Sequence, residues 1–208
     1  GENPQITLTL TEGNSAVLSE KLLERKLDVA LEAEPIQDPK IQSVAWCTEE
    51  IVLAVPARAP INQALSEYCY TFDELLKRRE PGGKKPPVPL QAFREEPFLL
   101  LQQGNELYTR SLELCRHAGF TPRASVYLTQ MMTAYYLVCE GQGVSFLRAS
   151  IPEYVAPTDS VVFYQLDDPL ALRPIYLSYL KRSSSPVQRK LLDFLWSRSL
   201  VEERSEES

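Results

Sequence analysis

The order of apolar and polar positions predicts two successive series of strands and helices. In the first series, residues 5–10 (QITLTL) alternate apolar and polar side chains, as a half-buried strand does. Residues 16–25 then place apolar side chains at helical spacing, and residues 27–31 (LDVAL) predict a second strand. Because the junctions are tight, these three elements predict a βαβ unit with parallel strands. Two more apolar runs, 41–46 and 50–55, predict two further strands of the same sheet.

A segment unsuited to regular structure separates the two series. Residues 77–89 (KRREPGGKKPPVP) hold four prolines, two glycines and five basic residues, which predicts an extended loop. The second series contains, in chain order, a strand at 98–101, a helix at 106–117, a strand at 123–127, a helix at 129–140, strands at 143–147, 161–166 and 174–180, and a helix with apolar positions from 187 to 195. The whole pattern predicts an α/β fold.

Composition and charge narrow the function classes. The chain has 208 residues and a formal charge of −6, which argues against a basic face for nucleic-acid phosphates. His117 is the only histidine, which argues against a metal site built from several histidines. No apolar run approaches the roughly 18 residues that cross a bilayer, and we expect no signal peptide. We therefore expect a cytoplasmic protein without metal, cofactor or membrane contact.

The pattern of the four cysteines favours structural roles over catalytic or redox roles. Cys47, Cys69, Cys115 and Cys139 are scattered and show no C-x-x-C spacing. Two of them lie on apolar faces of predicted helices, so buried, reduced thiols are the favoured interpretation. Cys115 and His117 do not form a nucleophile–base pair, because residues i and i+2 point apart on a helix. The histidine has no carboxylate partner visible in the sequence, and no catalytic residue is predicted.

Six short segments, in their order along the chain, carry a resemblance to a known family. These segments are 11–15 (TEGNS), 27–31 (LDVAL), 50–56 (EIVLAVP), 119–122 (GFTP), 141–147 (GQGVSFL) and 173–179 (RPIYLSY). Together they resemble the effector-binding domain of LysR-type bacterial transcriptional regulators. The resemblance runs from about residue 4 to residue 196, which is nearly the whole chain.

This resemblance implies a type II periplasmic-binding-protein-like fold, in which two Rossmann-like α/β lobes are joined by two crossover segments. Lobe I would comprise residues 1–60 and 184–208, and lobe II residues 61–183. The crossovers would follow residues 55–56 and 179–180. A small-molecule effector would bind in the cleft between the lobes.

The resemblance also implies partners, and the chain departs from the family at three places. A homodimer or higher oligomer would form through helices 16–25 and 106–117, and DNA would be bound only by an N-terminal winged helix-turn-helix that this chain does not include. The departures are an insertion at 77–89, the absence of a histidine from 57–61, and Arg148 where a proline commonly stands. The guanidinium of Arg148 would suit an anionic effector.

Candidate ligand-binding residues follow from where open α/β sheets bind ligands. Such ligands lie at the carboxyl ends of strands, where helix N-termini present free N–H groups. Residues 11–15 in the first series and 102–103 in the second follow predicted strands in this way, and residues 129–131 open the next predicted helix. Thr129 also matches a position that touches effectors in the family, whereas Ser145 and Phe146 lie on a predicted buried strand. The candidates are Thr11, Glu12, Gly13, Asn14, Ser15, Gln102, Gln103, Thr129, Gln130, Met131, Ser145 and Phe146.

Several of these candidates also have a purely structural interpretation. Asn14, Ser15 and Thr129 are good helix caps, Glu12 suits the positive end of a helix, and Phe146 is a typical core residue. The favoured function is therefore an effector-sensing regulatory domain, which is not an enzyme. A free-standing solute-binding protein of a transport system has the same fold. An enzyme on a related two-lobed fold would need an acid–base or nucleophilic constellation, and the sequence offers none.

Overall fold

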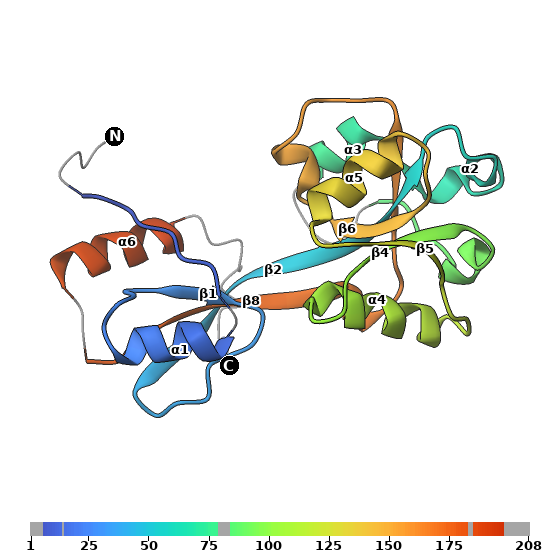
Figure 1. The fold of residues 1–208 in the computed structure, drawn as a ribbon. Coiled ribbons are helices and arrows are strands. Elements are labelled where there is room, and N and C mark those ends of the chain that lie inside the picture. The colour runs from blue at the N-terminus through green and yellow to red at the C-terminus, as the bar shows by residue number, and fades with distance from the viewer. Residues whose placement is uncertain (1–5, 14, 79–83, 183–184, 198–208) are drawn as a thin grey trace, which may run out of the picture. The chain divides into compact units, whose positions relative to one another are not determined.

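The computed structural model describes residues 6–13, 15–78, 84–182 and 185–197 (Figure 1). The chain packs as two compact units, which are residues Gly1–Thr48 with Pro174–Ser208 (unit 1) and Glu49–Arg173 (unit 2). Two long strands, β2 (Ile41–Pro56) and β8 (Leu172–Leu180), contribute residues to both units. For this reason the unit boundaries fall inside β2 and β8 rather than at residues 60 and 184. The assignment of functional lobes stays a prediction.

Unit 1 is built around a short antiparallel strand pair. It contains α1 (Ser15–Leu23), β1 (Ala30–Glu32) and α6 (Pro186–Trp196). β1 pairs antiparallel with β8, and β8 lies between β1 and β2 in the strand order. A small core of Leu22, Ala30 and Ile41 joins α1 to the strands. The indole Nε1 of Trp46 donates a 2.7 Å hydrogen bond to the Leu195 carbonyl, which ties α6 to β2.

Two predictions for unit 1 are wrong. Residues 6–10 form no strand in the described chain, and the side chains of Leu8 and Leu10 are 67% and 85% exposed. Apolar alternation forms a strand only where a partner strand pairs with it, and none of the described strands does so here. The expected parallel βαβ unit is therefore absent, since β1 takes β8 as an antiparallel partner.

The two strands expected at 41–46 and 50–55 are one continuous strand, β2. The residues between the two apolar runs, Cys47, Thr48 and Glu49, include no glycine or proline that would break it. Polar residues alone ended the predicted strand too early, because an extended chain continues through polar positions when neighbouring strands pair with it.

Residues 97–165 of unit 2 confirm the second predicted series up to its strand at 161–166, with boundaries shifted by a few residues. The last strand and helix of that series correspond to β8 and α6, and the elements between residues 61 and 77 carried no prediction. The elements of unit 2 in chain order are α2 (Ile61–Ala64), β3 (Cys69–Tyr70), α3 (Phe72–Lys77), β4 (Pro97–Leu101), α4 (Glu106–His117), β5 (Arg123–Leu128), α5 (Met131–Cys139), β6 (Ser145–Arg148) and β7 (Val161–Gln165), with 3-10 turns at Ser66–Tyr68, Leu90–Phe93, Ile151–Glu153 and Pro169–Ala171. The predicted loop at 77–89 begins at the last residue of α3, and residues 79–83 of it lie outside the described chain.

The strands of unit 2 bring three carboxyl ends to one edge. β4 pairs parallel with β5, and a parallel bridge between Phe98 and Val144 places the segment that leads into β6 on the other side of β4. Gly143 permits this approach, because a Cβ at its φ of +153° would lie 2.4 Å from the Pro97 carbonyl oxygen. β2 runs antiparallel to β6, so the beginning of its unit 2 portion reaches the same edge. We call this side of the sheet the carboxyl edge.

Aromatic side chains hold unit 2 together beneath that edge. The rings of Phe98 and Phe146 stack with centroids 5.8 Å apart, and both are nearly inaccessible to solvent. Phe93 meets Tyr164 edge-on at 5.2 Å. This packed core fixes the strand ends that carry the candidate site. Within the described residues, no helix is long and apolar enough to cross a membrane.

Candidate functional site

Four predicted ligand-binding residues meet at the carboxyl edge of unit 2. Gln102 and Gln103 directly follow β4, whereas Thr129 and Gln130 directly follow β5. The last residues of the two strands are paired, and the Gln102 amide donates a 2.8 Å hydrogen bond to the Leu128 carbonyl. All four side chains are exposed. The structure therefore places side chains from two junctions, 26 and more residues apart in the sequence, next to one another.

The helix α4 begins at the same edge. The carboxamide oxygen of Asn105 accepts a 2.9 Å hydrogen bond from the Leu107 amide and so caps the helix. The predicted helix start at Glu106 is confirmed. A capped helix N-terminus beside exposed amide and hydroxyl groups can bind a polar group of a ligand.

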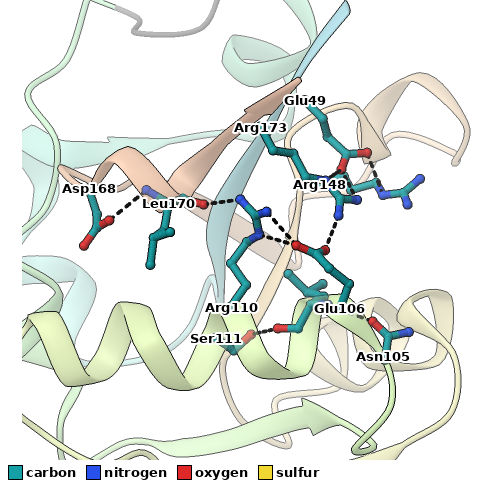
Figure 2. Close-up of polar contacts among 10 residues, drawn as sticks. Glu49, Asn105, Glu106, Arg110, Ser111, Arg148, Asp168, Leu170 and Arg173 are labelled. Atoms are coloured by element: carbon teal, nitrogen blue, oxygen red, sulfur yellow. Dashed lines mark hydrogen bonds and ion pairs between the residues drawn. The ribbon is translucent and has the colours of Figure 1, made fainter. Parts of the chain in front are cut away.

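A group of charged side chains, which we call the edge ion cluster, lies beside Asn105 and the beginning of α4 (Figure 2). Glu106, the first residue of α4, pairs with Arg110 across one helical turn at 2.6 Å, and Arg110 also donates to the Leu170 carbonyl. Arg173 pairs with both Glu106 and Glu49. The members of the cluster are Glu49, Glu106, Arg110, Arg148 and Arg173.

The outer end of the cluster is Arg148 at the carboxyl end of β6. Its Nε lies 2.8 Å from Glu49 Oε1, and its side chain is 47% exposed. Arg173 and Glu49, by contrast, are only 10% and 13% exposed. Three guanidinium groups face two carboxylates, so the cluster has one uncompensated positive charge.

Only Arg148 of this cluster was singled out from the sequence. The Glu106–Arg110 pair has i, i+4 helical spacing, which is a detectable signal for an ion pair but not for a ligand site. Glu49 and Arg173 lie just outside the predicted strands 50–55 and 174–180, and their pairing joins positions that are far apart in the sequence. No local pattern reports such a contact.

The predicted residues of unit 1 lie around the beginning of α1. Thr11, Glu12 and Gly13 are exposed and have no regular structure, and Ser15 is the exposed first residue of α1. Asn14 lies outside the described residues. These residues stay candidates for ligand binding, as they were from the sequence.

Three other candidates have clear packing roles. The hydroxyl of Ser145 is buried and donates a 2.8 Å hydrogen bond to the Leu99 carbonyl. Phe146 is part of the aromatic core of unit 2, and Met131 at the start of α5 packs against the same core. These contacts favour the structural interpretation for Phe146 and give no separate sign of ligand contact for Ser145 or Met131.

Glu32, at the end of β1 in unit 1, is a buried carboxyl group that sequence reasoning missed. It is only 7% exposed, and both of its oxygens lack a hydrogen-bond partner in the described structure. Burial raises the pKa of Glu32 above its ordinary value. Glu32 lies between the apolar residues Leu31 and Ala33, and this alternation gives no sign that its carboxyl group is buried.

Burial affects three of the four thiols, and the imidazole pairs with a carboxylate. Burial raises the pKa of the Cys115 thiol to about 12 and also raises the pKa of Cys69 and Cys139. His117, expected to have no carboxylate partner, instead lies 2.7 Å from Asp168, because the turn after β7 reaches the end of α4. Among the described residues, no three His, Cys, Asp or Glu side chains gather as metal ligands would.

A cavity of about 280 Å³ lies at the other end of α4, away from the carboxyl edge. It is lined by apolar side chains such as Val88, Leu114 and Leu166, and by the His117–Asp168 pair. None of the predicted ligand-binding residues contributes to its walls.

Comparison with known proteins gives one consistent likeness. Residues 1–199 match the family described as LysR substrate binding domain. The uncharacterized HTH-type transcriptional regulator YcgK of Bacillus subtilis (strain 168) is 31% identical over 147 residues, which are 68% of this chain and 43% of that protein. A probable hydrogen peroxide-inducible genes activator of Mycobacterium leprae (strain TN) is 30% identical over 159 residues, which are 76% of this chain and 43% of that protein. The chain thus spans less than half the length of these relatives.

The fold of the chain is also similar to that of a solved effector-binding domain. The effector-binding domain of BenM, solved with its effector benzoate, has a TM-score of 0.64 and 20% identity, and the match covers 93% of this chain and 82% of that chain. The predicted two-lobed, periplasmic-binding-protein-like α/β fold class is thereby confirmed.

Proposed function

The chain belongs to the LysR substrate-binding domain family, and from this premise we propose that its carboxyl edge in unit 2 binds a small-molecule effector of a transcriptional regulator. The observation that carries the proposal is the meeting of Gln102, Gln103, Thr129 and Gln130 beside the capped start of α4. Amide and hydroxyl groups at the ends of parallel strands can hydrogen-bond a polar ligand, as open α/β sheets commonly do.

We further propose that the chain binds its ligand without chemical turnover. The described structure offers no nucleophile paired with a base: the sole histidine pairs with Asp168, and Cys115 is fully buried. These features support a binding domain over an enzyme. A solute-binding protein of transport has the same fold, but the family of this chain favours the regulator, which we expect to act in the cytoplasm.

Sensing of peroxide through a thiol is not part of this proposal. A relative is named a probable hydrogen peroxide-inducible genes activator. Thiol oxidation requires a thiolate, and burial disfavours the thiolate of Cys69, Cys115 and Cys139 here. These pKa shifts disfavour peroxide sensing through Cys69, Cys115 or Cys139, and none of the three is among the residues proposed to bind ligand at the carboxyl edge.

Signal transfer would need partners outside this chain. We propose a homodimer or higher oligomer in which α1 of one subunit meets α4 of the other, and DNA binding by a separate domain of the full-length protein. Sedimentation of the purified domain tests the first part: a monomer at high concentration would contradict it.

A thermal-shift screen with small metabolites tests effector binding. A ligand at a hundred times its Kd stabilises the folded state by about 2.7 kcal/mol. We expect the substitution Thr129→Trp to abolish this shift without unfolding the domain, because the indole would fill the space at the edge. Thr121→Trp is the matched control, since Thr121 is also exposed but precedes β5 and so lies at the opposite edge. An unchanged ligand response in Thr129→Trp would refute the assignment of the edge.

A further inference from the structure

Arg148 is an exposed cation that is held by a buried network. Glu49 is the one partner that the structure gives Arg148 within the described chain, and Arg148 Nε is the atom nearest to it. A guanidinium carries five N–H donors in a planar fork, and its terminal amino groups match the two oxygens of a carboxylate. The 47% exposure of the side chain leaves this fork open to solvent.

The remaining members of the edge ion cluster fix Glu49 in place. Arg173, which is 10% exposed, pairs with Glu49 on one side and Glu106 on the other, and Arg110 holds Glu106 a second time. Arg173 and Glu49 are nearly buried, and buried ions are stable only when they are paired in good geometry, so the contact between these two has little freedom to rearrange. The side chain of Arg148 is therefore presented in one direction by an ordered chain of contacts (Figure 2).

The charge balance of the cluster is satisfied by one anion. Arg110 and Arg173 are 15% and 10% exposed, and each pairs with a carboxylate of the chain. The uncompensated positive charge thus falls on Arg148, the most exposed guanidinium of the three. A ligand with a single negative charge at this point would make the cluster neutral.

The location of Arg148 is that of the proposed site. β6 ends at Arg148 on the same edge at which β4 ends before Gln102 and β5 ends before Thr129. An anionic group at Arg148 would have amide and hydroxyl groups available on the neighbouring strand ends for the rest of the ligand.

We propose that the effector carries a carboxylate that binds the guanidinium of Arg148, and that Glu49 and Arg173 are positioning residues which set the specificity for one negative charge. This inference rests on the proposed function, and it adds the chemical class of the ligand and the residue that recognises it. A planar carboxylate fits the fork and the net charge of the cluster, whereas a phosphate dianion exceeds that charge.

The test is a thermal-shift and calorimetric screen of monocarboxylic acids, each with its primary amide, together with dicarboxylic acids and phosphate esters. Benzoate with benzamide is the first pair. We expect an acid to bind and its amide to bind about tenfold to a hundredfold more weakly, as the loss of a charge-assisted hydrogen bond implies. Arg148→Gln should remove this acid–amide difference, and Arg148→Lys should restore part of it. Arg94→Gln is the matched control, because Arg94 is an exposed arginine paired with Glu95.

A second variant separates positioning from mere stability. Glu49→Gln keeps the size of the side chain but raises the charge of the cluster from one to two positive charges, so it should shift preference from monocarboxylates toward dicarboxylates. A structural role alone would lower the Tm without changing that preference.

Three results would overturn the inference: a panel in which no carboxylate binds, phosphate esters as the tightest ligands, or an acid that binds Arg148→Gln as it binds the unaltered protein. A neutral ligand whose binding is lost in Thr129→Trp and unchanged in Arg148→Gln would refute the carboxylate while leaving the proposed function intact.

Discussion

Replacing Arg173 by methionine removes the guanidinium that pairs with both carboxylates of the edge ion cluster. The methionine fills a similar volume without charge, so the change isolates the loss of the guanidinium from the opening of a cavity. Two carboxylates, those of Glu49 and Glu106, lose a partner at once. Arg173→Met should therefore destabilise unit 2 more than any exposed ion-pair substitution.

The size of the effect follows from burial and from the remaining partners. Removing one member of a fully buried ion pair costs about 3–5 kcal/mol. Here Glu49 keeps Arg148, and Glu106 is 43% exposed and keeps Arg110, so the stranded charges are partly compensated. We therefore expect a smaller loss of about 2–3 kcal/mol, at or below the lower limit of that range. For a chain of this size the loss corresponds to a fall in Tm of roughly 4–12 °C.

Thermal unfolding followed by circular dichroism measures this difference. Arg94→Met is the control, because both members of the Arg94–Glu95 pair are exposed and such pairs contribute at most about 1 kcal/mol. A triple variant, Arg173→Met with Glu49→Gln and Glu106→Gln, should recover most of the stability, since it leaves no unpaired charge. The reasoning is refuted if Arg173→Met melts within about 2 °C of the unaltered protein or if the triple variant is no more stable than the single one.

Three further predictions concern other parts of the chain. Burial raises the pKa of Glu32 above 4.5 in the folded state, so ionisation of this group opposes folding as the pH rises. Glu32→Gln should therefore raise the Tm at pH 7, and this gain should vanish below pH 4.5, where the carboxyl is protonated in both states. A gain in Tm that persists in acid would contradict this prediction. Cys115, fully buried, should resist a thiol reagent at pH 8 until the protein unfolds in urea, and prompt labelling would show that its site opens. Thr71 caps α3 in a capping box with Glu74, so Thr71→Ala should cost about 1 kcal/mol in urea unfolding and Thr71→Ser much less; equal losses would exclude the cap as the cause.

The elements of unit 2 were predictable because their boundaries carry local signals. Asn105 caps α4 through its own side chain, and Gly119 ends it with a φ of +84°, so both limits of the helix are visible in the sequence. α5 ends before Gly141 in the same manner. The strand pairings of unit 1 were not predictable, since β1 pairs with β8, which lies at the other end of the chain.

Part of the candidate site was likewise predictable from local signals, and part depended on contacts between distant residues. The positions after β4 and β5 follow from the general rule that strands of a parallel sheet end at one edge, and the structure brings them together there. The edge ion cluster depends on contacts between residues 49, 106, 148 and 173, which lie on four different elements. Glu32 was missed for a similar reason, because its burial is decided by the packing around β1 and not by its neighbours in the sequence.

The position of Glu49 and Arg173 in the chain gives their ion pair a meaning beyond stability. Glu49 is the first residue of unit 2 and Arg173 the last, so their contact fixes to each other the two strands at which the chain enters and leaves this unit. Well-packed apolar side chains would stabilise such a contact at least as well as a buried ion pair. Apolar contacts have no preferred direction, however, whereas an ion pair between a guanidinium and a carboxylate fixes the orientation of both groups. What the charges add at this position is therefore the fixed direction of Glu49, and through it the presentation of Arg148 at the carboxyl edge.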